Sequence, residues 1–356
     1  MKDTKLIQIM DGEDDGARAE MLQKAGQIIR EGGLVAFPTE TVYGLGGDAL
    51  NPDSSRKIYE AKGRPSDNPL IVHIANMKAL PRIAADIPEA ARKLADAFWP
   101  GPLTMILPKT EAVPYETTGG LDTVAVRMPS HPVALAFIRE SGGYVAAPSA
   151  NTSGKPSPTL AAYVAEDMNG RIDMILDGGQ VGIGIESTII DLTVTPPQIL
   201  RPGYVTREML EKVLGEVAVD VTVMKSQEDC GQAPKAPGMK YRHYAPAGEL
   251  VIVQGQPEAV TAYINSRAAE DMAAGEKVGV IGTAEVLDEY RANVVKSVGS
   301  RMDEESIAHS LYAILREFDD EKVTRIYSEG FSAEGLGQAI MNRLLKAAGH
   351  HVVDLT

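Results

Sequence analysis

The sequence predicts an α/β protein with a larger domain on a twisted mixed sheet, a linker, and a small α/β domain. Two observations predict this organisation. The chain has 356 residues, more than a single compact core usually serves. Along most of it, segments with apolar residues at helical spacing alternate with short apolar runs, which is typical of strands packed against helices.

The first part of the chain predicts a domain over residues 1–210 in which helices and strands alternate. Apolar stripes at helical spacing predict helices over residues 17–30, 53–61, 88–98, 132–140, 158–168 and 207–214. Short apolar runs predict strands over residues 34–37, 70–74, 103–107, 124–127, 145–147, 174–176 and 188–192.

Beyond this domain the pattern changes twice. Periodicity fades into KSQEDCGQAPKAPGMKYRHYAPAG, whose prolines and glycines predict a linker over residues 211–246. Residues 247–356 then predict a small Rossmann-like βαβ array. Its strands are expected over residues 250–253, 278–281, 324–327 and 351–355, and its helices over residues 258–273, 304–318 and 336–347. The array lacks the glycine fingerprint of a dinucleotide site, so we expect a lid or docking domain.

Composition narrows the class of protein. A formal charge of −14, from 35 Lys and Arg against 49 Asp and Glu, argues against a protein that coats nucleic acid. We see neither a membrane-spanning run nor a signal-peptide pattern, so we expect a cytoplasmic protein with no membrane attachment. The single cysteine, Cys230, excludes an intrachain disulfide and a CxxC zinc site, and no metal-binding residues are expected.

The stretch LVAFPTETVYGLGGD predicts a strand that ends in polar residues. Pro38 cannot donate to a sheet ladder, so the strand is expected to stop there, with Thr39 and Thr41 exposed at its end. The glycines that follow match neither a dinucleotide motif nor a P-loop. Such a strand end is typical of a ligand site, although a tight turn would explain one or two of the glycines.

The stretch KGRPSDNPLIVHI carries two cations, an amide and a histidine. Lys62 and Arg64 lie one residue apart in a rigid loop and could clasp phosphate oxygens, with Asn68 nearby. A solvated turn is the alternative. His73 lies on a strand pattern, where it could serve a ligand or be a satisfied core histidine.

Two arginines each end an apolar run. Arg127 closes Val-Ala-Val and needs an anionic partner, which could be the carboxylate of a ligand or an internal Asp or Glu. Arg201 closes Ile-Leu in the same way.

Two further polar stretches follow or open strands. The loop PSANTSGKPS contains hydroxyls, an amide and a lysine but departs from the P-loop pattern, and Ser187 opens a strand. Together these residues predict a cavity lined by arginines, hydroxyls and one histidine, suited to an amino acid beside a nucleotide.

The motifs PTETVYGLGGDAL, KGRPSDNPLIVHI, FWPGPLT, VAVRMPSHP, APSANTSGKPSPT, ESTIIDL and ILRPG resemble those of the YrdC-like family, the threonylcarbamoyl-AMP synthases. The resemblance covers almost all of residues 15–210 and implies a YrdC-like twisted mixed-sheet domain. The linker phrase APGMKYRHYAP, followed by a small α/β domain, resembles the long form of that family.

The resemblance implies an L-threonylcarbamoyladenylate synthase, a nucleotidyltransferase. L-threonine and bicarbonate would form N-carboxythreonine, which attacks the α-phosphate of ATP and releases pyrophosphate. Mg²⁺ would accompany ATP, held largely by the triphosphate and water. A downstream tRNA threonylcarbamoyl transferase would then modify the adenosine beside the tRNA anticodon, and the chain itself would bind tRNA weakly.

The resemblance also implies roles for the polar residues. Lys62 and Arg64 are expected to be catalytic. The residues expected at ATP are Arg64, Asn68, Ser149, Asn151, Ser157 and Arg201. The aromatic and basic residues of the linker further predict that residues 236–246 form a lid over the cavity, with Tyr241 and His243 at ATP; a tether packed on the surface is the alternative. The residues expected at threonine are Thr39 or Thr41, His73, Arg127 and Ser187.

Two alternatives belong to other functional classes. One is an RNA-binding module without catalysis, which the net charge and the 5% aromatic content weaken. The other is a carbamoyl-transfer maturation factor for hydrogenases, which resembles a chain with zinc-finger cysteines and is excluded by the single cysteine.

Overall fold

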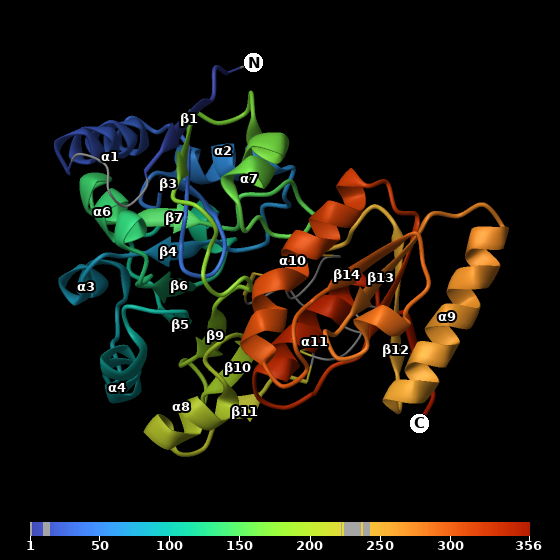
Figure 1. The fold of residues 1–356 in the computed structure, drawn as a ribbon. Coiled ribbons are helices and arrows are strands. Elements are labelled where there is room, and N and C mark those ends of the chain that lie inside the picture. Colours follow the sequence, from blue (N-terminus) through green and yellow to red (C-terminus); the bar gives the residue numbers. More distant parts are fainter. Residues whose placement is uncertain (1, 10–14, 222, 224–235, 238–242) are drawn as a thin grey trace. The chain divides into compact units, whose positions relative to one another are not determined.

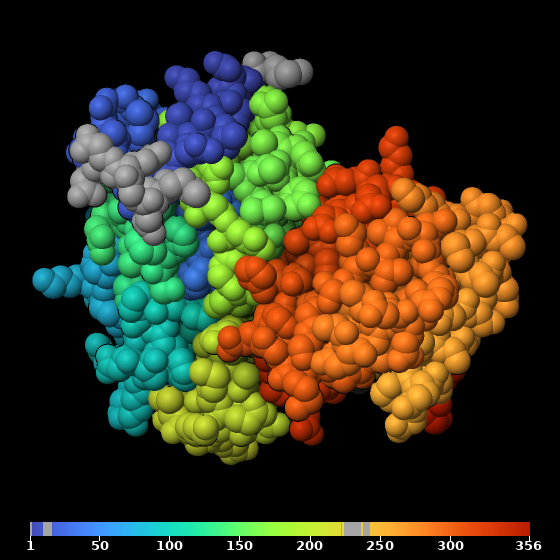
Figure 2. Space-filling model, viewed as in Figure 1, coloured from blue at the N-terminus to red at the C-terminus, as the bar shows by residue number. Residues whose placement is uncertain are grey.

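The computed structural model describes residues 2–9, 15–221, 223, 236–237 and 243–356. The chain forms two compact units (Figure 1). The ranges in the first unit are Met1–Ser153, Ser157–Gly182 and Glu186–Lys240, and those in the second are Gly154–Pro156, Ile183–Ile185 and Tyr241–Thr356. The space-filling view shows side chains packed closely over both (Figure 2).

The first unit is built on one mixed sheet of eleven strands in the order β1-β8-β2-β3-β7-β4-β6-β5-β9-β10-β11. The strands are β1 Lys5–Gln8, β2 Val35–Phe37, β3 Gly44–Asp48, β4 Ile71–His73, β5 Leu103–Pro108, β6 Thr123–Arg127, β7 Val145–Ala147, β8 Met174–Asp177, β9 Thr188–Asp191, β10 Gln198–Arg201 and β11 Ala218–Val219. Strand β4 pairs in parallel with β6, and β6 pairs antiparallel with β5. Strand β5 continues the sheet in parallel with β9.

Helices cover both faces of this sheet. They are α1 Asp15–Arg30, α2 Pro52–Lys62, α3 Leu80–Ile83, α4 Glu89–Phe98, α5 Tyr115–Thr118, α6 Pro132–Glu140, α7 Ala161–Met168 and α8 Arg207–Leu214, with a 3-10 turn, η1, at Met77–Ala79. The largest apolar core joins one face to α2, α3, α4, α7 and α8. A second core joins the other face to α1 and α6.

Part of that second face is covered differently. An apolar cluster there consists of Ile71, Ile106, Ala125, Ile189, Leu200 and Ala236. These residues come from strands β4, β5, β6, β9 and β10, together with Ala236 from the linker. The candidate site lies on this face of the sheet, beside that cluster.

Helix α2 has well-formed ends, and its C-terminus leads into the predicted phosphate loop. Asn51 caps the N-terminus by accepting a hydrogen bond from Asp53 N at 3.0 Å, and proline occupies the first helical turn. Gly63 ends the helix in the left-handed conformation, with φ of 63°. The helix therefore stops between Lys62 and Arg64 and fixes the backbone that carries both cations.

The glycines that follow the threonines form strand β3. A Cβ on Gly46 would lie 2.9 Å from Val145 Cγ1, and one on Gly44 would lie 3.1 Å from Phe37 Cζ. Because β3 pairs with both β2 and β7, side chains of the neighbouring strands fill the space above it. These glycines serve close packing between strands.

The second unit is built on a sheet of five parallel strands in the order β14-β13-β15-β12-β16. The strands are β12 Glu249–Gln254, β13 Val278–Gly282, β14 Val294–Ser297, β15 Arg325–Glu329 and β16 Val352–Asp354. The helices are α9 Pro257–Ala273, α10 Glu304–Asp320 and α11 Gly335–Ala347, with a 3-10 turn, η3, at Leu287–Glu289. Helix α9 packs on one face of the sheet, and α10 and α11 lie on the other (Figure 1).

The α/β fold class predicted from the sequence is confirmed, and most expected elements are present. The helix expected from residue 158 begins instead at Ala161, after the prolines of the preceding loop. Strands β1, β3, β10, β11 and β14 were not predicted. Strand β11 lies in the stretch expected to be linker, and it extends the first sheet by pairing with β10.

Candidate functional site

The sheet register places a row of polar side chains across adjacent strands of the first unit. His73 at the end of β4 is the register partner of Arg127 at the end of β6. Arg127 is in turn the register partner of Thr104 on β5. Register partners point to the same face of a sheet, so these three side chains lie beside one another. Ser187, just before β9, and Arg201, at the end of β10, continue this polar row.

His73 is held as a neutral ring. Its Nδ1 lies 3.0 Å from Ile71 O, and because a carbonyl can only accept, Nδ1 carries the proton. Burial, and next the Arg127 charge, lower the pKa of His73 to about 3. The other ring nitrogen, Nε2, is therefore a hydrogen-bond acceptor at neutral pH.

Arg127 is buried beside one carboxylate. Its Nη2 lies 2.7 Å from Glu40 Oε1. The contact lacks hydrogen-bond alignment, so Nε and Nη2 of Arg127 have no hydrogen-bond acceptor among the described residues. A guanidinium whose buried N–H groups are unused can hold a ligand carboxylate.

The hydroxyls of Thr39 and Thr41 differ in their remaining capacity to form hydrogen bonds with a ligand. Thr39 Oγ1 donates to Val42 O at 2.6 Å and accepts from the backbone N–H groups of Thr41 and Val42 at 3.2 and 3.3 Å. The Thr39 hydroxyl is thereby committed to shaping the turn. Both threonines are buried, so the expectation that their side chains are exposed is wrong. In the described part of the chain, the Thr41 hydroxyl contacts only Thr39 Oγ1, at 2.9 Å. Thr41 thus retains hydrogen-bonding capacity for a ligand.

Ser187 is held by two neighbours. Arg201 donates from Nη2 to Ser187 Oγ at 3.1 Å and from Nε to Ser187 O at 3.0 Å. The hydroxyl of Thr104 lies 2.8 Å from Ser187 Oγ. The structure thus places Arg201 next to Ser187, a residue expected at threonine, although the sequence analysis expects Arg201 at ATP.

Lys62 ties the PSANTSGKPS loop to the end of α2. Its ammonium donates to Ser149 O at 2.5 Å, to Asn151 O, and to Asn151 Oδ1 at 3.5 Å. Asn151 Oδ1 also accepts from Ser149 Oγ at 2.5 Å. These contacts bring the expected ATP residues Lys62, Ser149 and Asn151 together.

Arg64 and Asn68 form the neighbouring turn. Arg64 donates from Nε to Asn68 O at 3.3 Å and from Nη2 to Pro69 O at 3.2 Å. The side-chain oxygen of Asn68 is buried and has no hydrogen-bond donor among the described residues. Such an orphan acceptor suggests a ligand donor at this position.

Ser157 introduces a further carboxylate. Its Oγ donates to Glu186 Oε1 at 2.6 Å, and both side chains are buried. Because Glu186 precedes Ser187, this bond joins an expected ATP residue to the backbone next to an expected threonine residue.

Only part of the predicted lid over residues 236–246 can be placed. Tyr241 lies outside the described residues. Ala236 is fully buried in the apolar cluster on the sheet, and Pro237 O lies 3.5 Å from Arg201 Nη1. His243 belongs to the second unit, where its ring centroid lies 5.5 Å from that of Tyr244.

Three further residues belong to this site but carry no assigned role in the sequence analysis: Glu40, Thr104 and Glu186. Glu40 and Glu186 stand inside recognised motifs and could have been chosen as acids next to candidate residues. Thr104 is a buried hydroxyl in an apolar strand, and that single polar position was its signal.

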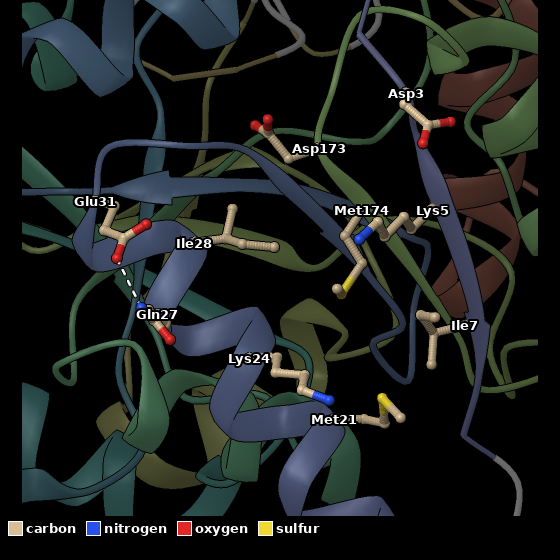
Figure 3. A pocket seen from close by; sticks show the side chains of 10 residues that line it. All are labelled: Asp3, Lys5, Ile7, Met21, Lys24, Gln27, Ile28, Glu31, Asp173 and Met174. Atoms are coloured by element: carbon tan, nitrogen blue, oxygen red, sulfur yellow. Dashed lines mark hydrogen bonds between the residues drawn. The ribbon is translucent and has the colours of Figure 1, made fainter.

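A separate cavity lies at the edge of the sheet (Figure 3). It has a volume of about 530 Å³ and lies between α1 and the segment that contains edge strand β1. Lys24 and Glu31 of α1 and Lys5 of β1 lie at it, and Ile28 and Met174 supply apolar surface. None of the predicted site residues lines this cavity.

In the part of the chain that the structure describes, no three His, Cys, Asp or Glu side chains are grouped in a way that could hold a metal ion. None of the described helices combines the length and apolar character needed to cross a membrane.

Comparison with known proteins gives similarity along nearly the whole chain. Residues 27–203 match the Sua5/YciO/YrdC family, described as telomere recombination, and residues 205–349 match the C-terminal domain of threonylcarbamoyl-AMP synthase. The chain is 52% identical to threonylcarbamoyl-AMP synthase of Pyrococcus abyssi over 331 residues, covering 93% of this chain and 95% of that protein. It is also 52% identical to the Bacillus subtilis enzyme of that name over 333 residues, covering 93% and 94%. The crystal structure of P. abyssi Sua5 complexed with L-threonine has a TM-score of 0.93 and 49% identity, and the match covers 99% of this chain and 100% of that one.

Proposed function

Because this chain belongs to the threonylcarbamoyl-AMP synthase family, we propose that it condenses L-threonine, bicarbonate and ATP into threonylcarbamoyl-adenylate and pyrophosphate. The observation that carries the proposal is the polar row across β4, β6 and β5. It sets a neutral histidine beside an arginine whose Nε and Nη2 have no hydrogen-bond acceptor among the described residues, which is a combination that fits a zwitterionic amino acid.

The amino-acid subsite follows from these chemistries. Arg127 would bind the threonine carboxylate, with Ser187 adding a hydroxyl. His73 Nε2 and Thr41 would accept hydrogen bonds from the ammonium or the side-chain hydroxyl. With a pKa of about 3, His73 retains a proton poorly, so it would orient the amine and not store its proton.

The nucleotide subsite would lie at the C-terminal end of α2 and the PSANTSGKPS loop, which Lys62 joins by hydrogen bonds. Lys62 and Arg64 supply positive charge, and the orphan oxygen of Asn68 could accept from the base or the ribose. Ser149, Asn151 and Ser157 add hydroxyl and amide groups on the same loop. Arg201, next to Ser187, would lie near the junction of the two substrates.

These residues would act mainly by placement and charge. The carbamate formed from threonine and bicarbonate attacks the α-phosphate, the bond from the α-phosphate to the pyrophosphate group breaks, and pyrophosphate leaves. The cations would neutralise charge that develops on the phosphate oxygens. ATP would enter as its magnesium complex, in which the phosphates and water hold Mg²⁺ and neutralise phosphate charge.

We further propose the setting of this reaction. The product would pass to a downstream tRNA threonylcarbamoyl transferase in the cytoplasm, and the chain itself would bind tRNA weakly. The linker would cover the site, and the contact of Pro237 with Arg201 supports this placement for the start of the lid. Its remaining part, with Tyr241 and His243, is proposed to close over ATP.

The decisive experiment measures pyrophosphate release from ATP and Mg²⁺ with L-threonine and bicarbonate added together, singly or not at all. We expect release only with both, accompanied by a product with the mass of threonylcarbamoyl-adenylate. Pyrophosphate release that ignores both co-substrates would refute the proposal. Truncation after Val223, which keeps α8 and β11 in the first unit, tests the lid, since unchanged product formation without leakage of the adenylate would exclude a lid role.

A further inference from the structure

The hydroxyls of Thr104 and Ser187 form a buried hydrogen-bonded pair in which one hydroxyl proton has no acceptor among the described residues. The two oxygens lie 2.8 Å apart, so one hydroxyl donates to the other. Ser187 Oγ also accepts from Arg201 Nη2, which can only donate. The hydroxyl that accepts within the pair keeps its own proton. In either arrangement, that proton has no acceptor among the described residues.

Burial makes this surplus costly. Thr104 is 0% exposed and Ser187 is 1% exposed, so the pair has little contact with bulk solvent. A buried donor without an acceptor costs free energy comparable to a lost hydrogen bond. The arrangement therefore favours a ligand that brings an acceptor to this point.

The positions of the two residues in the sheet indicate which hydroxyl keeps its proton for a ligand. Thr104 lies inside β5, between β6 and β9, while Ser187 lies in the backbone just before β9 begins. If Thr104 donates, Ser187 accepts two hydrogen bonds and its own proton points out of the pair. This alternative places the free donor at the border of the polar row instead of inside the sheet.

We propose that Thr104 is a positioning residue that donates to Ser187 and thereby aims the Ser187 hydroxyl as a donor at the substrate carboxylate. The carboxylate is the natural acceptor because Thr104 is the register partner of Arg127, whose Nε and Nη2 have no hydrogen-bond acceptor among the described residues. Thr104 would act through Ser187 without touching the substrate. This inference rests on the proposed function, because it assumes that the row binds an amino acid.

The test compares Thr104→Ser, which keeps the hydroxyl, with Thr104→Ala, which removes it. Calorimetric titration with L-threonine should give Thr104→Ser a Kd within about threefold of the unsubstituted protein, and Thr104→Ala a Kd raised about tenfold. The KM for ATP should stay unchanged in both. Thr104→Val preserves the side-chain shape and should match Thr104→Ala; if it fails to fold, the Ser and Ala pair still decides.

A double substitution separates positioning from packing. In a Ser187→Ala background, Thr104→Ala should cause no further loss of threonine affinity, because its effect passes through the missing hydroxyl. A matched control is Thr117→Val, which removes another fully buried hydroxyl, one that donates to Ala49 O at 2.9 Å. This control should lower the melting temperature and leave the Kd for threonine unchanged.

Three results would overturn the inference: equal affinities for Thr104→Ser and Thr104→Ala, a loss that appears in the KM for ATP instead, or additive losses in the double variant. Failure of the unsubstituted protein to bind L-threonine is a different outcome. It would refute the proposed function as well as the inference built on it.

Discussion

Arg127 Nη2 and Glu40 Oε1 lie 2.7 Å apart in an ion pair whose side chains are 5% and 13% exposed. Glu40 also accepts from Ser130 N at 3.1 Å, so the carboxylate is fixed from a second side. The Glu40 carboxylate therefore balances the charge of Arg127 inside the protein. Nε and Nη2 of the guanidinium have no hydrogen-bond acceptor among the described residues, which supports the proposal that Arg127 binds a ligand carboxylate.

Replacing Arg127 with alanine should weaken L-threonine binding by about 2 to 5 kcal/mol, the range for removing one partner of a desolvated charge pair. Calorimetric titration measures the loss. Arg139→Ala, an exposed arginine in the last turn of α6, is the matched control and should bind threonine normally. An Arg127→Ala protein that is folded and binds threonine with unchanged affinity would contradict the assignment.

Lys62→Ala should impair the ATP-dependent step more than threonine binding. The substitution removes a positive charge and leaves the carbonyls of Ser149 and Asn151 without their donor, at about 1 to 3 kcal/mol for each buried group. Lys62→Ala should therefore raise the KM for ATP more than it raises the Kd for threonine. Lys57→Ala, an exposed lysine on the same helix, is the control. The reverse order of effects would mean that the two subsites are interchanged.

Substitutions of Thr39 and Thr41 should affect different properties, with the first lowering stability and the second weakening threonine binding. Thr39→Val removes a hydroxyl that organises the turn, so it should lower the free energy of unfolding by about 1 to 3 kcal/mol. Thr41→Val should instead raise the Kd for L-threonine while costing less stability. Denaturant unfolding and titration of both variants provide the comparison, and equal effects on both quantities would remove the distinction.

His73 should make the protein less stable as pH falls. Its pKa is lowered in the folded state, so the unfolded chain binds the proton first, and the stability contribution present above about pH 6.5 is lost toward pH 3. Between about pH 7.5 and pH 5, the protein should lose about 2 kcal/mol more unfolding free energy than its His73→Gln variant. Parallel stability curves for the two proteins would show that His73 is not buried in its neutral form.

The strand ends were predictable because they obey local rules. A proline after an apolar run and an arginine closing another are visible in the sequence, and both mark real strand ends, at Phe37 and Arg127. Strand β3 was not predictable in this way. Its glycines contradict strand propensity, and they are explained only by the Phe37 and Val145 side chains that pack above them.

The partners within the site depended on long-range pairing. That His73, Arg127 and Thr104 are neighbours follows from sheet register, which no local pattern encodes. The same reason hid the pairing of Glu40 with Arg127, although both residues stand in motifs that the sequence analysis singled out. The choice between Thr39 and Thr41 required the hydrogen bonds of the turn.

The pairing of β4 with β6 has a consequence for selectivity. His73 and Arg127 occupy one rung of a parallel ladder, and Ile74 N bonds to Arg127 O at 2.9 Å just beyond it. The pairing thus fixes the separation of the two backbone positions that carry the proposed amine acceptor and the proposed carboxylate donor. In the proposed subsite this fixed separation would favour an α-amino acid over a β-amino acid, whose ammonium and carboxylate groups lie one methylene further apart.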